Sequence, residues 1–233
     1  MMPSIEAHRR DKGYCWGSLV WQINDCWPVA SWSTRDYYGR WKAAHYMLRW
    51  AMSDILVSPI QQPDGILSVT LVNDRLSSVR GQLTIEVWNA SELRYHATQR
   101  VSVKPNSANE VWKMSTHQLL AQAGIQENEA IIHAEFLPEG KAQVVYSNNY
   151  TLVCPKDLKL VPAQVKWEMD NGQLTITTDN YARGIFLTLE GDDNHHFSDN
   201  YFDLLPGETR TISVTTTLPA EELSSRLRVM TYR

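Results

Sequence analysis

The stretch that decides the fold runs from Gly17 to Trp50 and reads GSLVWQINDCWPVASWSTRDYYGRWKAAHYMLRW. Six of the nine tryptophans of the chain lie between Trp16 and Trp50. Residues 17–23 form a nearly continuous apolar run, which is typical of a strand buried on both faces in a parallel sheet. A loop containing Pro28 follows this predicted strand.

A helix is predicted after the loop, over residues 36–52. The apolar residues with helical spacing are Tyr37, Trp41, Ala44, Leu48 and Ala51. Asp36 or Thr34 is expected to cap the start of this helix. Strand, loop and helix make one βα unit, and because one such unit cannot bury its own surface, this part of the chain must dock onto other structure.

The rest of the chain predicts two β-sandwiches made of short strands between turn residues. Expected strands of the first are 66–73, 81–88, 95–103, 130–137 and 142–153, with a helix at 115–124 capped by Ser115 or Thr116 and stopped by Gly124. Expected strands of the second are 163–169, 173–180, 184–191, 208–216 and 226–232. Asp170-Asn171-Gly172 predicts a tight hairpin turn between the first two of these.

The composition excludes several classes of function. With 22 Lys and Arg against 26 Asp and Glu, the formal net charge is −4, which argues against a nucleic-acid partner. No apolar run approaches the roughly 18 residues of a membrane span, so we expect no membrane partner. The three cysteines, Cys15, Cys26 and Cys154, form no CxxC pair, and we expect buried free thiols.

The 17–50 stretch resembles the end of the catalytic (β/α)8, or TIM, barrel of β-mannosidases in glycoside hydrolase family 2. In that family the last barrel strand reads G-x-L-x-W-Q-x-N-D-x-W-P, followed by S-W and a tyrosine-rich helix start with G-R-x-K. The matching residues are Gly17, Leu19, Trp21, Gln22, Asn24, Asp25, Trp27, Pro28, Ser31, Trp32, Asp36, Tyr37, Gly39, Arg40 and Lys42. In addition, FSDNYFDLLPGE at 197–208 is similar to a motif in the family's last domain.

The resemblance covers essentially the whole chain and implies three parts. Residues 1–54 would be the last strand and helix of the barrel, and 55–154 and 155–233 would be two immunoglobulin-like β-sandwich domains. The fold class expected is therefore mainly β, with a barrel remnant in front. The family's two catalytic glutamates lie on the fourth and seventh barrel strands, upstream of this remnant, so no catalytic residue is expected in this chain and the chain alone is expected to be inactive.

The resemblance also implies a set of substrate-binding residues. Trp21 would line the mannose subsite, although it could instead pack in the barrel core. Gln22 follows Trp21, and because side chains alternate along a strand it is expected to point elsewhere, so a site role is less strongly implied for it. Asn24 and Asp25 could bind sugar hydroxyls or could fasten the loop by bonds to backbone amides. Trp27 could form a platform for the aglycone or pack beside the following proline.

Other residues that could carry chemistry are expected to be structural. Trp32, Trp41 and Trp50 are expected to be structural, with the last two in the core on the helix. His195 and His196 are expected to lie in a surface loop or a domain contact rather than to bind a metal, because neighbouring residues on a strand point to opposite faces. The sandwich tryptophans, expected in cores rather than on a carbohydrate-binding face, are Trp88, Trp112 and Trp167.

The function implied is removal of terminal β-D-mannose from the non-reducing ends of β-mannosides, with retention of configuration. The partners implied are a β-mannoside oligosaccharide and the rest of the barrel; no cofactor and no metal are expected. The alternatives are a non-catalytic carbohydrate-binding or scaffold module and a sister activity such as β-galactosidase or β-glucuronidase. The spacing of the motif favours a cytoplasmic or periplasmic enzyme over a lysosomal one.

Overall fold

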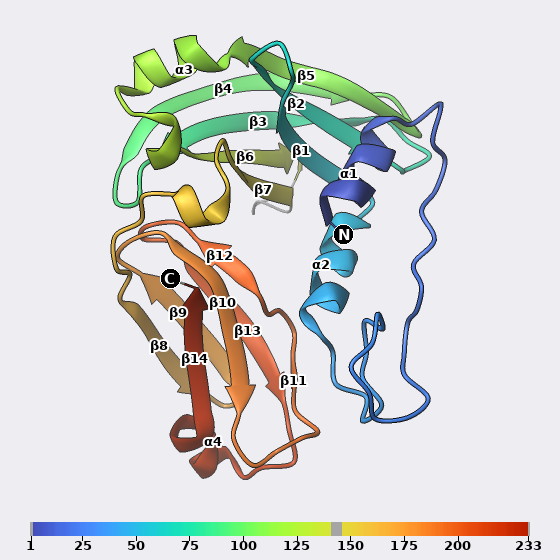
Figure 1. The fold of residues 1–233 in the computed structure, drawn as a ribbon, viewed down its shortest axis with the longest axis vertical. Helices are drawn as coiled ribbons and strands as arrows, with labels where there is room; N and C mark the ends of the chain where they lie inside the picture. The colour runs from blue at the N-terminus through green and yellow to red at the C-terminus, as the bar shows by residue number, and fades with distance from the viewer. Residues whose placement is uncertain (1, 141–145, 233) are drawn as a thin grey trace. The chain divides into compact units, whose positions relative to one another are not determined.

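The structure is a computed structural model, and it describes residues 2–140 and 146–232 (Figure 1). The chain divides into two compact units. The first joins Met1–Ser18 to Ala51–Leu160, and the second joins Leu19–Trp50 to Val161–Arg233. Within the described ranges, no helix has the length and apolar character needed to cross a membrane.

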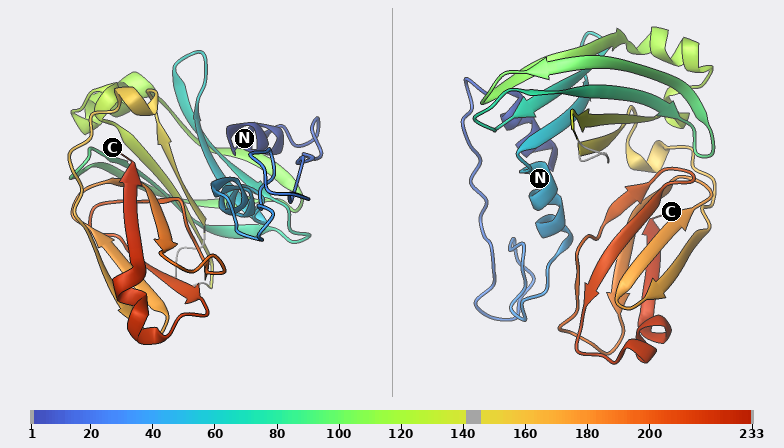
Figure 2. Two further views of the ribbon diagram at one scale, coloured as in Figure 1. Left: turned by 60° about the horizontal axis from the view of Figure 1, so that its bottom comes forward. Right: turned by 180° about the vertical axis from the view of Figure 1, so that it is seen from behind.

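The first unit contains an antiparallel sandwich (Figures 1 and 2). One sheet has the order β1-β2-β5 and the other the order β4-β3-β6-β7. The strands are β1 (Ile55–Gln61), β2 (Ile66–Asn73), β3 (Val79–Trp88), β4 (Leu93–Val103), β5 (Ser107–Ser115), β6 (Ile131–Pro138) and β7 (Tyr146–Thr151). Alternate residues of β3 are buried, as expected of a strand with one face toward a core.

The core of this sandwich is formed by side chains from both sheets. Leu83, Ile85 and Phe136 come from the four-stranded sheet, and Val57 and Val69 come from the three-stranded one; all five are at most 1% exposed. The α3 helix (Thr116–Ala123) adds Leu119 to a neighbouring cluster. A 3-10 turn at Glu127–Glu129 and another at Pro155–Asp157 complete the unit.

The sequence did not predict the α1 helix (Met2–Arg10), which packs onto the first sandwich. Ser58 on β1 donates a hydrogen bond to Glu6 at 2.9 Å and accepts one from Arg10 at 2.6 Å. Arg9 pairs with Asp74 at 3.0 Å. Polar contacts to a buried hydroxyl therefore fix the register of this helix.

Glu6 is expected to make the stability of this unit depend on pH. Burial raises the pKa of Glu6 above its ordinary value of 4.5, although Ser58 and Arg10 oppose the change. The folded protein thus holds the proton of the Glu6 carboxyl group more tightly than the unfolded chain does. The resulting contribution of Glu6 to the free energy of unfolding is complete below about pH 4.5 and is lost as the pH rises through the folded pKa. Denaturant unfolding between pH 4 and 7 should show this loss in the natural chain and a flatter profile for Glu6→Gln. Identical profiles for the two proteins would contradict it.

The second unit contains the other sandwich, with sheets β11-β13-β9-β8 and β12-β10-β14. Its elements are β8 (Val165–Asp170), β9 (Gln173–Thr178), β10 (Ala182–Leu189), β11 (His196–Phe197), β12 (Phe202–Leu204), β13 (Thr209–Thr215), α4 (Ala220–Arg226) and β14 (Leu227–Tyr232). Ile176, Leu187 and Ile212 lie in its core and are fully buried. The α2 helix (Ala43–Ala51) precedes both sandwiches in the chain and belongs mostly to this unit.

Several local predictions are confirmed. The strands of both sandwiches form close to the expected ranges, and Asn171 and Gly172 take φ values of 46° and 75°, as a tight hairpin turn requires. Gly124 ends α3 in the left-handed conformation. The expected cap is wrong, because the side chain of Ser115 makes no capping hydrogen bond and Thr116 instead accepts one from Gln61. Part of the strand expected at 142–153 lies in 141–145, outside the described residues; its later part is β7.

The strand predicted at 17–23 is wrong, and so is the start of the predicted helix. No strand forms there, and α2 begins only at Ala43. A strand in a closed parallel barrel is hydrogen-bonded to a neighbour along each edge, whereas in the described structure the backbone of 22–25 pairs only with 34–35, through an isolated bridge between Asn24 and Arg35. The predicted first turn of the helix is occupied by a reverse turn at residues 36–40.

The prediction of buried thiols is also wrong. All three cysteines are free, but Cys26 and Cys154 are exposed and Cys15 is half-buried. Cys26 lies in the irregular loop after Asp25, and Cys154 follows β7 in the connection to the second sandwich. Neither position offers an apolar interior for a thiol.

Candidate functional site

The site predicted from sequence lies on a loop of the second unit, residues 21–42, which we call the tryptophan loop. Its two arms are joined by backbone hydrogen bonds from Thr34 to Gln22 O at 3.0 Å and from Arg35 to Ile23 O at 2.8 Å. The Thr34 hydroxyl also donates to Ile23 O at 3.1 Å. The loop therefore has a defined course although it contains no regular strand.

Asp25 is the internal anchor of the tryptophan loop. Its side chain is 1% exposed and accepts hydrogen bonds from Ser31, from Ser33 at 2.7 Å and from Lys42 at 3.2 Å. The bonds from Ser31 and Ser33, followed by the charge of Lys42, lower the pKa of Asp25. In this structure Asp25 fastens the loop, as one of its two predicted roles requires, but through the side chains of Ser31, Ser33 and Lys42 rather than through backbone amides.

We expect the hydrogen bonds of Asp25 to hold the loop less well at acid pH. The pKa of Asp25 is lowered in the folded state. The contribution of the ionised Asp25 to the stability of the loop is therefore present above pH 3.8, the ordinary pKa of the group, and is lost as the pH falls through the folded pKa. Hydrogen exchange of the amides of residues 31–34 should accelerate in that range beyond the intrinsic rate. In Asp25→Asn these amides should exchange faster at neutral pH and show no acid transition; an acid transition of equal size in both proteins would contradict this role.

A second anchor is the turn at residues 36–40. The Arg40 amide donates to Asp36 Oδ1 at 2.9 Å, and the Arg40 guanidinium pairs with Asp36 Oδ2 at 2.6 Å. Burial opposes ionisation of Asp36, but these bonds from Arg40 keep its pKa below the ordinary value. Gly39 has a φ of +91°, which favours glycine, and a Cβ there would lie 2.8 Å from the Arg35 guanidinium.

The other predicted site residues lie on the outside of the loop. Trp21 is 80% exposed, Trp27 is 63% exposed, and Asn24 is also exposed. Gln22 is half-buried, and the peptide bond between Trp21 and Gln22 is cis. Asn24 donates to the carbonyl of Asp25 at 3.2 Å. Asp25 thus points into the loop, whereas the other four predicted site residues have accessible side chains.

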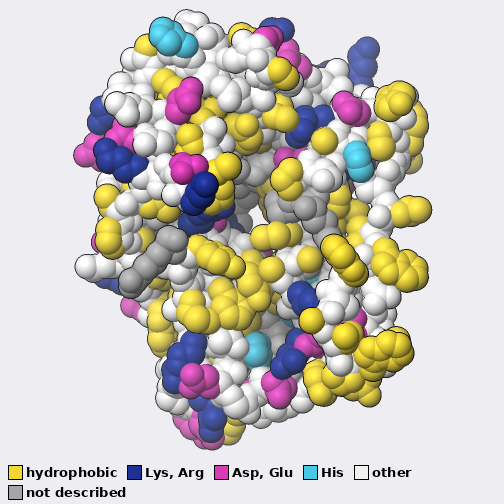
Figure 3. Space-filling view, in the orientation of Figure 1, with side chains coloured by type: hydrophobic (Ala, Val, Ile, Leu, Met, Phe, Trp, Pro, Cys, Tyr) yellow, Lys and Arg dark blue, Asp and Glu magenta, His cyan; other side chains and the backbone are white. Residues whose placement is uncertain are grey.

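Hydrophobic side chains gather on the surface along this loop (Figure 3). The exposed ones between residues 19 and 38 are Leu19, Trp21, Ile23, Trp27, Val29, Trp32, Tyr37 and Tyr38. Trp32, which was expected to be structural, is 80% exposed, because the contacts that hold this part of the loop are made by Asp25, Ser31 and Ser33. Trp41 and Trp50 are half-buried.

We expect this apolar surface to drive association of the isolated chain, because contiguous exposed apolar area promotes contacts between molecules. Light scattering should show oligomers whose population grows with protein concentration. Replacing Trp27 and Trp32 together with serine should shift the population toward monomer. A monomer at all concentrations would contradict the expectation.

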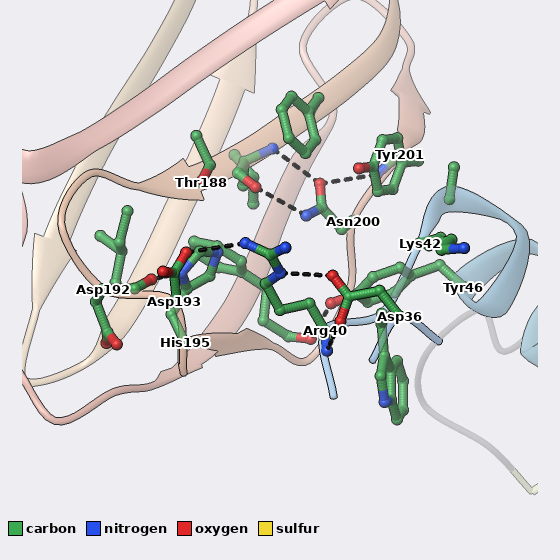
Figure 4. A pocket seen from close by; sticks show the side chains of 16 residues that line it. Asp36, Arg40, Lys42, Tyr46, Thr188, Asp192, Asp193, His195, Asn200 and Tyr201 are labelled. Atoms are coloured by element: carbon green, nitrogen blue, oxygen red, sulfur yellow. Dashed lines mark hydrogen bonds and ion pairs between the residues drawn. The ribbon is translucent and has the colours of Figure 1, made fainter. Parts of the chain in front are cut away.

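A pocket of about 340 Å³ lies within the second unit, and the end of the tryptophan loop forms part of its wall (Figure 4). Its lining comes from residues 36–46 and from residues 186–201, which include the second half of β10 and part of β11. In the close-up, Arg40 lies between two carboxylates, with ion pairs to Asp36 and, at 2.9 Å, to Asp193. None of the five predicted substrate-binding residues lines this pocket.

Aromatic rings form much of the remaining pocket wall. Tyr201 stacks on Phe186 with 4.8 Å between ring centroids, and Tyr46 lies 5.9 Å from Tyr201. The Tyr46 hydroxyl donates to Phe197 O at 3.2 Å, and burial raises the pKa of Tyr46 to about 12. Sequence analysis identified the motif that contains Tyr201 but not the pocket, because its two walls are about 150 residues apart in the chain.

The two adjacent histidines take different positions. His196 lies on β11 with its ring 4.4 Å from Trp41, and burial followed by the nearby charges of Arg49 and His195 lowers its pKa. His195 contacts the carbonyl of Asp192 through Nδ1 at 2.5 Å. Across the described residues, no group of three or more His, Cys, Asp or Glu side chains is placed to hold a metal ion.

The sandwich tryptophans are partly buried. Trp112 and Trp167 pack against the hydrophobic clusters of their own domains, as predicted. Trp88 is half-buried at the end of β3, and its indole N–H donates to Glu86 at 2.7 Å. These contacts favour a structural role for Trp112 and Trp167.

Comparison with known protein families identifies both sandwiches. Residues 65–157 match the model described as "Mannosidase Ig/CBM-like domain", and residues 156–233 match the mannosidase "Ig-fold domain". The two sandwiches are mannosidase-type immunoglobulin-like domains. This confirms the mainly β fold with two immunoglobulin-like domains that the sequence predicts.

Curated relatives extend the similarity to most of the chain. Beta-mannosidase A of Aspergillus oryzae is 28% identical over 229 residues, which cover 91% of this chain and 25% of the fungal protein. Beta-mannosidase B of Thermothelomyces thermophilus is 27% identical over 228 residues, 86% of this chain and 26% of that protein. The chain is thus related to β-mannosidases but spans about a quarter of their length.

Solved structures give the same result. The β-D-mannosidase of Dictyoglomus thermophilum matches 99% of this chain with a TM-score of 0.82 and 26% identity, and the match covers 28% of that enzyme. The exo-chitosanase CsxA of Amycolatopsis orientalis shares the fold with a TM-score of 0.67 at 17% identity. The similarity to the first structure agrees with the family resemblance of the 17–50 motif.

Proposed function

We propose that this chain is the carboxy-terminal portion of a retaining β-mannosidase, which hydrolyses terminal non-reducing β-D-mannose residues of β-mannosides. The observation that carries this proposal is the unbroken G-x-L-x-W-Q-x-N-D-x-W-P motif at 17–28 in a chain related to β-mannosidases over nearly its whole length. Residues 1–54 are the end of the catalytic barrel, and 55–154 and 155–233 are accessory immunoglobulin-like domains.

In this proposal the tryptophan loop forms one wall of the substrate pocket. Trp21 packs its ring on the apolar face of the mannose, Gln22 and Asn24 bind hydroxyl groups, and Trp27 contacts the aglycone. The exposure of Trp21 and Trp27 supports these roles, because a side chain must be accessible to reach a sugar. Asp25 positions the wall through its bonds to the two serines and Lys42.

The catalytic carboxyl groups come from elsewhere in the enzyme. Retaining hydrolysis needs two carboxyl groups about 5 Å apart on either side of the bond that breaks. The two acids of the loop are engaged otherwise, Asp25 in its buried anchor and Asp36 in the ion pair with Arg40. Both are therefore better suited to hold the loop than to act as nucleophile or acid.

The test starts with the reading frame that contains Met1. The protein that this frame encodes is assayed on aryl β-mannoside, β-galactoside and β-glucuronide, beside the 233-residue chain. We expect turnover of the mannoside by the encoded protein and none by the chain alone. Preference for another glycoside would indicate a sister activity, and a frame that starts at Met1 and gives no turnover would indicate a non-catalytic carbohydrate-binding or scaffold module; either result would contradict the proposal.

A further inference from the structure

The pocket at the end of the tryptophan loop is lined by none of the residues that bind substrate in the proposed hydrolysis. Its volume of about 340 Å³ is near the lower end for small-molecule sites, about 300–1,000 Å³. Both of its walls belong to the second unit, so its lining is defined by that unit alone. Its size suits a mono- or disaccharide rather than a large cofactor.

The aromatic rings of the pocket suit a ligand with flat apolar faces. Tyr46, Phe186 and Tyr201 form a continuous series of rings, with neighbouring centroids 4.8 and 5.9 Å apart. Such rings offer broad, rigid contact area at little cost in side-chain entropy. The C–H faces of a pyranose ring have matching dimensions.

The charges of the pocket nearly cancel, which favours a neutral ligand. Arg40 is shared between Asp36 and Asp193, and Lys42 is held by Asp25. No cation of the lining is therefore left to bind a phosphate or carboxylate group. The exposed carboxylate of Asp193 keeps acceptor positions open for hydroxyl donors.

Two hydroxyl groups of the pocket remain available for hydrogen bonding. In the part of the chain that the structure describes, Tyr201 has a hydrogen bond only through its backbone amide, and the Thr188 hydroxyl makes none. Tyr201 is half-buried, and a tyrosine in that position usually finds a partner for its hydroxyl. Figure 4 shows both side chains at the pocket with Asn200 between them, bonded to the Leu187 backbone.

We propose that this pocket binds a neutral mono- or disaccharide, with a pyranose ring packed on Tyr201 and Phe186 and hydroxyl groups bonded to Tyr201, Thr188 and Asp193. The site is separate from the wall formed by Trp21 and goes beyond the proposed function. It gives the carboxy-terminal unit a sugar-binding role of its own. Because the ligand is neutral, added salt leaves its affinity nearly unchanged.

The experiment is a titration of the chain with β-1,4-mannobiose, followed by NMR and calorimetry. Tyr201→Phe and Thr188→Val each remove one hydroxyl and keep the shape of the side chain, so they should fold normally. Each should weaken binding about fivefold, the effect of losing one hydrogen bond. Tyr14→Phe, at a tyrosine that is 94% exposed and outside the pocket, is the matched control and should bind as the natural chain does.

Trp21→Ala separates this proposal from the proposed function. Saturable binding that survives in Trp21→Ala and is weakened in Tyr201→Phe and Thr188→Val supports the pocket. Binding that is lost in Trp21→Ala but unchanged in the two pocket variants would overturn the pocket while supporting the wall. No binding at millimolar sugar, or displacement of the sugar by inorganic phosphate, would also overturn it.

Discussion

In the active enzyme, Trp21→Ala is expected to lower kcat/KM on an aryl β-mannoside by about a hundredfold or more, because a tryptophan ring buries a large contact area against its ligand. Trp32 offers a matched control, since both tryptophans are 80% exposed in this structure and lie on the same loop. Trp32→Ala should change kcat/KM by less than about threefold, because the proposal gives Trp32 no contact with the substrate.

The comparison separates contact with substrate from general effects on the loop. Thermal unfolding of the two variants should be alike, because each loses an exposed ring. Equal losses of activity in Trp21→Ala and Trp32→Ala would show that the loop needs its apolar surface as a whole. That result would contradict the proposed contact between the Trp21 ring and the mannose.

Gly81→Ala is expected to destabilise the first sandwich by about 3 kcal/mol or more, at the upper end of the usual cost of overpacking. A Cβ at Gly81 would lie 2.2 Å from the carbonyl oxygen of Leu137 and 2.8 Å from the ring of Phe136. The clash is with the backbone of the neighbouring strand β6, which a change of rotamer cannot relieve.

Gly17→Ala is the control for this substitution, because a Cβ there has no neighbour within 4 Å and its φ is not in the left-handed region. Urea unfolding followed by circular dichroism should show a much lower midpoint for Gly81→Ala and an unchanged one for Gly17→Ala. Equal midpoints would mean that β3 and β6 are not paired as described.

The two sandwiches could be predicted because their strands combine alternating hydrophobicity with strong turn residues. β3 buries every second residue, and Asn171-Gly172 forms the tight turn that its sequence demands. β1 and β5 were not predicted as separate strands. β1 contains Pro59, which is tolerated because β1 is an edge strand, and β5 is largely polar.

The tryptophan loop could be predicted as a motif but not as a structure. Its apolar run at 17–23 suggested a buried strand, and strand formation depends on partners that a sequence pattern does not reveal. The contacts that hold the loop are polar and local, from Asp25 to Ser31, Ser33 and Lys42. The pocket could not be predicted, because it depends on how the 36–46 segment docks onto the second sandwich.

The central claim is that the chain supplies a wall of a β-mannosidase site whose acids lie in other segments. A fluorinated mannosyl inactivator that traps the covalent intermediate tests it most directly, because in a retaining enzyme the label marks the nucleophile. The account predicts that, in the active enzyme, peptide mapping finds the label on a glutamate outside these 233 residues, and that the chain alone takes up none. A label on Asp25, Asp36 or any other carboxylate of this chain would contradict the account.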